Sequence, residues 1–242
     1  MKLRKYVGSI YKRVLGPLSY QFGIYRRKGA YFLLNKKSMM DETIIKFKHY
    51  EEDMIDYANK IITEDQLTHV IDIGSNLGYY TVRLGKIPTI KKVVSFEPLP
   101  SLYIQMSSNV LINALIDKWQ GYNLALSDHS GKATLYYHPF FLGTSSLNKD
   151  WTERASHRVE VDVRAFDEVI EISGEHCFVK IDVEGSEISV LKGMKRFLST
   201  NKAFIQVETT GDRLDEITSI LNKEGYSLKG NPFKNDYYFS NY

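Results

Sequence analysis

Acidic side chains follow several apolar segments of the chain, and two of these segments lead into glycine-containing turns. The first is VIDIGSNLGYY (70–80), in which Asp72 is followed by Gly74 and Gly78. An apolar run before such a turn predicts a buried strand, a sharp change of backbone direction and then a helix. Both glycines are expected where the backbone turns and a ligand comes close. Asp72 is expected to accept a hydrogen bond from a ligand ammonium or hydroxyl group.

The spacing of this turn distinguishes two kinds of nucleotide ligand. A dinucleotide-binding turn has the pattern Gly-x-Gly-x-x-Gly and holds a pyrophosphate. Here Asn76 stands where the second glycine would be, so its side chain hinders close approach of a diphosphate. A smaller zwitterionic end, such as that of S-adenosylmethionine, fits better, and the helix start that follows favours its anionic group. A purely structural strand–turn–helix is the alternative.

A second apolar segment, KVVSFE (92–97), ends in an acid about 20 residues past the glycine turn. In doubly wound folds an acid at this distance binds the ribose hydroxyls of a nucleoside. We therefore predict that Glu97 is the ribose ligand, with a solvated acid at a strand end as the alternative.

The rest of the chain alternates strand-like and helix-like patterns. This order predicts a mostly parallel sheet with helices on both faces. Asp72, Glu97, Asp182 and Glu208 each fall at the carboxyl end of a predicted strand. Ligands bind at that edge of such sheets, so four acids there indicate a site.

Length and composition bound the organisation of the chain. The 242 residues suit one α/β domain, which we place at 49–242, preceded by a basic extension, 1–48, expected to be helical. The single cysteine, Cys177, excludes an internal disulfide and suits a reducing compartment, so we expect the cytoplasm. No apolar run is long enough to span a bilayer.

Charge is unevenly distributed along the chain. Residues 1–40 hold ten Lys and Arg and no acid. Because the net charge of the whole chain is +3, the remaining residues have a net charge of −7. Such an arm can dock on its own domain or contact an anionic membrane surface. The acidic remainder argues against nucleic acid as a partner.

A second strand–acid–glycine segment, FVKIDVEGSE (178–187), completes a pattern that resembles the FkbM-type family of S-adenosylmethionine-dependent methyltransferases. The segments that carry the resemblance are VIDIGSNLGYYT (70–81), SFEPLPSLYIQMSSNVLIN (95–113), NLALSDHSG (123–131), GTSSL (143–147), KIDVEGSEISVLKG (180–193) and IQVE (205–208). The resemblance implies a class I methyltransferase fold. This is a Rossmann-like three-layer sandwich whose mostly parallel seven-stranded sheet has an antiparallel last strand.

The same resemblance implies the positions of the cofactor ligands. The residues expected to bind S-adenosylmethionine are Asp72, Gly74, Asn76, Gly78, Tyr79, Glu97 and Asn123. Glu97 would hold the ribose and Asn123 the adenine, although Asn123 also suits a turn-capping role. Asn109 and Asn113 would brace the intervening helix.

Transfer of a methyl group to a hydroxyl needs a group that removes the proton. Asp182 is our first candidate, followed by Glu184 and Glu208, with His138 and His157 as the histidine alternatives. A divalent metal is not favoured; if one were bound, Asp182 and Glu208 would supply oxygen ligands. The aromatic-rich irregular segment 138–157 is expected to cover the acceptor pocket, with ordinary packing as the alternative.

These observations favour an O-methyltransferase that acts on a hydroxyl of a sugar in a glycan or glycosylated intermediate. Methylation of a small secondary metabolite and a nucleoside-binding module without turnover are the alternatives. The sequence indicates neither the acceptor hydroxyl nor the oligomeric state.

Overall fold

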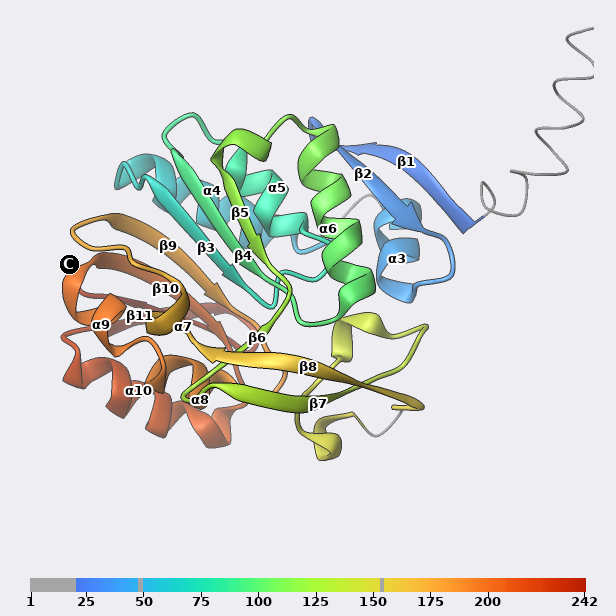
Figure 1. Ribbon diagram of the computed structural model, residues 1–242. Coiled ribbons are helices and arrows are strands. Elements are labelled where there is room, and N and C mark those ends of the chain that lie inside the picture. Colours follow the sequence, from blue (N-terminus) through green and yellow to red (C-terminus); the bar gives the residue numbers. More distant parts are fainter. Residues whose placement is uncertain (1–20, 48–49, 153–154) are drawn as a thin grey trace, which may run out of the picture.

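The computed structural model describes residues 21–47, 50–152 and 155–242 and places them around one central sheet (Figure 1). The seven strands follow the order β11 (Ser227–Phe233), β12 (Asp236–Ser240), β10 (Lys202–Glu208), β9 (His176–Ile181), β3 (His69–Ile73), β4 (Lys92–Phe96) and β5 (Trp119–Tyr122). β12 runs antiparallel to both of its neighbours, whereas the pairs from β10 to β5 are parallel. The predicted seven-stranded, mostly parallel sheet with an antiparallel last strand is therefore confirmed.

Helices cover both faces of the sheet, as the strand–helix alternation predicts. One face packs against α4 (Glu52–Glu64), α5 (Tyr79–Gly85) and α6 (Pro100–Ile112). The other packs against α7 (Phe166–Val169), α8 (Glu187–Lys192), α9 (Lys195–Thr200) and α10 (Leu214–Lys223). β3, β9 and β10 are almost wholly buried because helices cover them on both sides.

A smaller sheet lies beside the carboxyl ends of the central strands. In it, β8 (His157–Ala165) pairs in parallel with β6 (Ala125–Ser127) and antiparallel with β7 (Gly131–Tyr137). The segment between β7 and β8 carries two short 3-10 turns, at Leu142–Thr144 and Lys149–Trp151. Two more such turns lie at Ile116–Lys118 and Gly211–Arg213.

The described part of the basic extension is not mainly helical, so that expectation was wrong for residues 22–35. β1 (Phe22–Arg27) and β2 (Ala30–Asn35) form an antiparallel hairpin, and only α3 (Met39–Phe47) is helical. Lys28 and Gly29 both have positive φ, as a two-residue hairpin turn requires. Residues 1–20, which carry much of the positive charge, lie outside the described residues.

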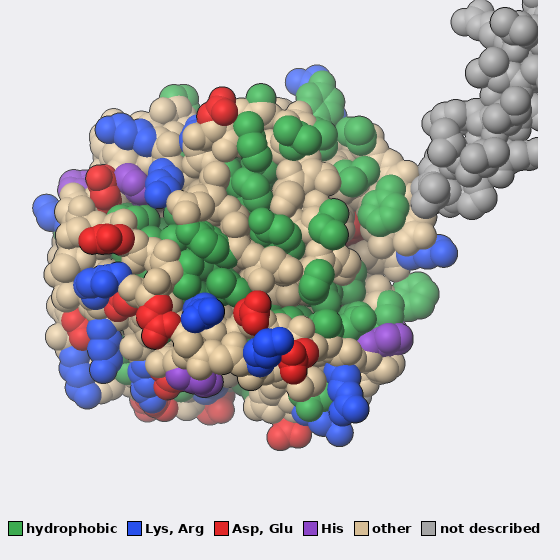
Figure 2. Space-filling model, in the orientation of Figure 1, with side chains coloured by type: hydrophobic (Ala, Val, Ile, Leu, Met, Phe, Trp, Pro, Cys, Tyr) green, Lys and Arg blue, Asp and Glu red, His purple; other side chains and the backbone are tan. Residues whose placement is uncertain are grey.

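Asn109 of α6 and Asn113, which caps the end of that helix, fasten the hairpin to the domain. The Leu33 amide donates to Asn109 Oδ1 at 2.6 Å, and the Tyr31 amide donates to Asn113 Oδ1 at 2.9 Å. Asn109 Nδ2 also donates to the Leu77 carbonyl at 2.8 Å, which ties α6 to the glycine turn. These residues brace the helix as predicted. Figure 2 shows hydrophobic side chains over α6 and the hairpin, whereas charged side chains gather over the lower part of this face.

Candidate active site

Two glycines shape the turn between β3 and α5, but only one of them faces the candidate site. Gly74 has φ +81°, and a β-carbon there would overlap the carbonyl group of Asp182 on the neighbouring strand. Gly78 has the same φ, but its β-carbon would instead meet the Met106 side chain of α6. Gly78 therefore permits close packing of α5 on α6, and its expected contact with a ligand stays a prediction.

Asp72 links the end of β3 to the first turn of α5 through hydrogen bonds to Thr81. Its Oδ2 accepts hydrogen bonds from the Thr81 amide at 3.0 Å and the Thr81 hydroxyl at 2.6 Å. Its Oδ1 is buried and has no hydrogen-bond partner among the described residues. Burial raises the pKa of Asp72, and the Lys180 ammonium and Thr81 oppose that shift. A buried acceptor without a partner beside a cavity is what an ammonium-bearing ligand would satisfy.

Glu97 follows β4 and binds two backbone amides. Oε2 accepts from the Asn76 amide and Oε1 from the Leu99 amide, each at 2.8 Å. Burial raises the pKa of Glu97 to about 7, against the effect of these amides. Each carboxylate oxygen has a further lone pair, so the group can still accept hydrogen bonds from a diol.

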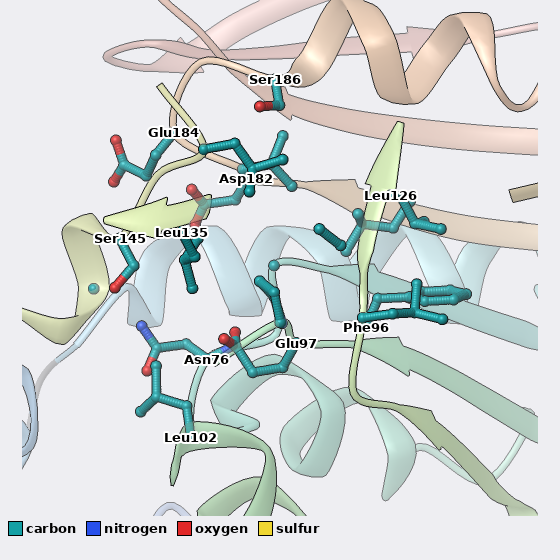
Figure 3. Close-up of a pocket in the computed structure, with 18 of the residues that line it drawn as sticks. Asn76, Phe96, Glu97, Leu102, Leu126, Leu135, Ser145, Asp182, Glu184 and Ser186 are labelled. Carbon is teal, nitrogen blue, oxygen red and sulfur yellow. The ribbon is translucent and has the colours of Figure 1, made fainter. Parts of the chain in front are cut away.

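A first cavity opens between the ends of β3, β4 and β9 and the smaller sheet. It encloses about 610 Å³ of empty space, part of it open to solvent. Figure 3 shows Asn76 and Glu97 together on one side and Asp182 and Glu184 on the other. Apolar residues form much of the remaining wall, among them Phe96, Pro98, Leu102, Leu124, Leu126, Leu135 and Val183. Apolar walls with a carboxylate at one end suit a nucleoside.

A second cavity adjoins the first and is more polar. It encloses about 900 Å³, and Gly74, Asn76, Gly143, Asp182 and Glu184 line both cavities. Asp72 lines this second cavity and Glu97 the first, so the two acids do not share one pocket as the sequence suggested.

Lys180 stands in the wall of the second cavity and was missed by the sequence analysis. Its Nζ lies 2.7 Å from Asp182 Oδ2 and 4.5 Å from the centre of the Tyr80 ring. Burial disfavours the ammonium, but Asp182 and Glu51 outweigh that effect, and the pKa of Lys180 lies well above its ordinary value. The sequence does contain a sign of this role. Lys180 interrupts an apolar run, and it lies on the same face of the strand as Asp182 because residues two apart in a strand share a face.

The remaining acids of the second cavity are half-buried and crowded. Burial, reinforced by the charge of Asp182, raises the pKa of Glu184 to about 7 and of Glu208 to about 8. Burial also raises the pKa of Glu51. Crowded carboxyls of this kind hold protons near neutral pH, as residues that move protons do.

Residues of the segment that we predict to cover the acceptor pocket line two of the cavities, and α3 forms a further part of the wall. Phe141, Gly143 and Thr144 line the second cavity, and Trp151 lines a third that also contains Asp182 and Glu208. Met39, Met40 and Thr43 of α3 also line the second cavity, although they belong to the segment that the sequence analysis placed outside the catalytic domain.

Three other predicted residues have local partners. Tyr79 is among the residues that line the second cavity, and its hydroxyl donates to Glu52 Oε1 at 2.7 Å. Asn123 is exposed, lines neither cavity, and donates to the Glu97 and Pro98 carbonyls, as a turn-capping residue would. His138 lines neither cavity, and its Nδ1 accepts from the Phe140 amide at 3.1 Å.

Neither a metal-binding cluster nor a membrane-spanning helix is present in the described part of the chain. No group of three or more His, Cys, Asp or Glu in residues 21–47, 50–152 and 155–242 is arranged to hold a metal ion. Within the same ranges, no helix has the length and apolar character needed to cross a membrane.

The mostly parallel seven-stranded sheet with helices on both faces is the class I methyltransferase fold. The fold is similar to M. jannaschii TYW2 solved in complex with AdoMet, with a TM-score of 0.50 and 13% identity over 91% of this chain and 84% of that one. It is also similar to a putative transferase of Pyrococcus horikoshii, with a TM-score of 0.50 and 11% identity over 99% of this chain and 83% of that one.

Residues 72–228 match the Methyltransferase FkbM domain, and the chain belongs to that family. Among its relatives is methyltransferase sdnD of Sordaria araneosa, 25% identical over 74% of this chain and 81% of that protein. Another is the hexuronic acid methyltransferase AglP of Haloferax volcanii, which is 28% identical over 74% of this chain and 71% of that protein.

Proposed function

We propose that this protein transfers a methyl group from S-adenosylmethionine to a hydroxyl of a sugar in a glycan or glycosylated intermediate. The observation that carries the proposal is the position of Asp182, which lines both the first cavity, with its largely apolar wall, and the more polar second cavity. A group at that junction is within reach of an acceptor oxygen in the second cavity and of a methyl group presented from the first.

The residues present fit the cofactor. Glu97 would hold the ribose hydroxyls, the apolar wall of the first cavity would receive the adenine, and the unpaired Oδ1 of Asp72 would attract the ammonium. The cofactor supplies a methyl group on a positively charged sulfur, which is a good leaving group. The protein must therefore mainly align the acceptor oxygen and exclude water.

Asp182 is the residue best suited to take the proton of the acceptor hydroxyl. The Lys180 ammonium donates to its Oδ2 at 2.7 Å and so holds the carboxyl group at the junction of the two cavities. Glu208, with a pKa of about 8, is mostly protonated at neutral pH and is therefore a weaker candidate. In the reaction, Asp182 would accept the proton of the acceptor hydroxyl, and the bound cofactor would supply the methyl group while its sulfur keeps the electron pair of the broken carbon–sulfur bond.

The walls of the second cavity support an uncharged polyhydroxyl acceptor. Carboxyl groups can accept hydrogen bonds from sugar hydroxyls, and the aromatic faces of Tyr50 and Phe141 suit the apolar face of a sugar ring. Among the residues lining this cavity, five are acids and Lys180 is the one cation, so a phosphate backbone would be repelled. The hexuronic acid named for one relative supports a sugar acceptor. Met39 and Met40 in the same wall also favour the second candidate, a small apolar metabolite.

The test is methyl transfer from methyl-labelled S-adenosylmethionine to a panel of neutral hexoses, hexuronic acids, glycosides and small phenols. Label in a sugar, with mass gain of one CH₂ unit and a new ether methyl signal by NMR, supports the proposal. Label only in phenols would move the assignment to the metabolite, and cofactor binding without transfer to any acceptor class would favour the binding module.

A further inference from the structure

We propose that Lys180 is the counter-charge for the carboxylate at the methionine end of the cofactor. The inference rests on the proposed cofactor and concerns a residue to which neither the motifs nor the family assignment gave a role. It starts from an imbalance of charge in the second cavity.

The methionine end of S-adenosylmethionine carries one ammonium and one carboxylate. The glycine-turn residues Gly74, Ser75 and Asn76 line the second cavity, so that end would lie there. An entering ammonium meets acids on several sides, whereas an entering carboxylate meets one cation among the lining residues, Lys180. A carboxylate left without a cation or donor in such a place would be strongly disfavoured.

The geometry of Lys180 leaves capacity for this contact. An ammonium has three N–H donors. One points to Asp182 Oδ2 at 2.7 Å, and the side chain is held over the Tyr80 ring. Lys180 is 6% exposed, so its position is fixed and its desolvation has already occurred in the folded protein. A fixed ammonium loses little further entropy when a carboxylate arrives.

The charge of Lys180 could instead serve Asp182 alone, and a ligand pair separates the two roles. Decarboxylated S-adenosylmethionine keeps the adenosine, sulfonium and ammonium groups and lacks only the carboxylate. If Lys180 binds the carboxylate, its removal weakens only the complete cofactor. If it serves Asp182 alone, both ligands respond alike.

The experiment is calorimetric titration of wild type, Lys180→Met and Lys180→Arg with both ligands. The wild type should bind S-adenosylmethionine more tightly than the decarboxylated form. Lys180→Met should lose about 10- to 100-fold of affinity for S-adenosylmethionine. The Lys180→Met variant should bind the decarboxylated form as tightly as the wild type does or more tightly, because it lacks the ammonium that repels this cationic ligand. Lys180→Arg should retain part of the preference.

The matched control is Lys195→Met, which removes an exposed lysine on α9, a helix that lines none of these cavities. It should leave both affinities unchanged. Equal affinities of the wild type for the two ligands, or parallel losses in Lys180→Met, would overturn the assignment to Lys180 alone. If Lys180→Met does not fold, Lys180→Arg still tests the assignment, since an unchanged preference in that variant would overturn it, and so would equal affinities in the wild type. Failure of the wild type to bind either ligand would remove the proposed cofactor itself.

Discussion

Gly74 lies directly against the backbone carbonyl of Asp182, so the cofactor turn and the candidate base are in van der Waals contact. A β-carbon at position 74 would overlap that carbonyl. The Asp182 amide also donates to the Ile73 carbonyl at 3.0 Å. The end of β9 is therefore fixed against the end of β3, and a change in the turn must displace Asp182.

Gly74→Ala should impair both cofactor binding and turnover. The new methyl group collides with backbone, and φ of +81° is costly for alanine, so the turn must move. We expect affinity for S-adenosylhomocysteine to fall about tenfold or more by calorimetry. Gly211→Ala, at a position with open space around it, is the control and should bind normally. Normal binding by Gly74→Ala would show that the turn does not face the ligand.

Asp182→Asn should separate binding from chemistry. The substitution keeps the size of the side chain and removes the proton acceptor, so S-adenosylhomocysteine should still bind. The methyl-transfer rate should fall about a hundredfold or more. Steady-state rates with the acceptor found in the labelling panel provide the measurement. A rate within a factor of about two of wild type would place the base elsewhere, with Glu184 and Glu208 next to test.

Asn109→Ala should destabilise the protein by releasing the hairpin. The substitution leaves the Leu33 amide and the Leu77 carbonyl without their partner. We expect the free energy of unfolding in urea to fall by about 2 kcal/mol or more. Ser108→Ala on the same helix removes only a bond to the Ile104 carbonyl and should change it by about 0.5 kcal/mol or less. Equal effects of the two substitutions would contradict the bracing role.

Stability should decrease as pH rises from about 5 to about 8 through the contribution of the buried carboxyls. Burial raises the pKa of Asp41 to about 6, of Glu97 and Glu184 to about 7, and of Glu208 to about 8. In this range the folded state binds more protons than the unfolded state. Their stabilising contribution is therefore present at low pH and lost as pH rises through the folded pKa values.

Thermal unfolding across this range, in wild type and Glu208→Gln, tests that contribution. The neutral amide should make the decline shallower between about pH 6 and pH 8, because one proton fewer is released. His69, whose pKa is lowered by burial, acts in the opposite direction but is common to both proteins. Identical slopes in the two proteins would contradict a raised pKa for Glu208.

The sequence predicted the features that depend on short local patterns. Apolar strands precede the glycine turn, Glu97 and the acids after β9 and β10. Because parallel strands end at the same edge of a sheet, these residues come together there. The hairpin was missed because the cluster Arg26, Arg27 and Lys28 was interpreted by its charge. The alternating burial along β2 shows the period of two that predicts a strand.

Other features depended on contacts between distant segments. Nothing in the local pattern around Met39 and Met40 indicates that they line a cavity with the acids that follow β9. A bond from Gln105 of α6 to Asp41 of α3 helps to position that segment. The packing role of Gly78 was missed because a glycine in a turn does not reveal which neighbour needs the space. In the folded chain that neighbour is Met106.

The central claim is that the first cavity binds the adenosine of the cofactor through Glu97, and calorimetric titration with S-adenosylhomocysteine tests it most directly. The account predicts one site in the wild type and about 100-fold weaker binding in Glu97→Ala, which loses a charged acceptor. Glu160→Ala, an exposed acid on β8, should bind as the wild type does. Absence of binding in the wild type, or undiminished affinity in Glu97→Ala, would contradict the claim.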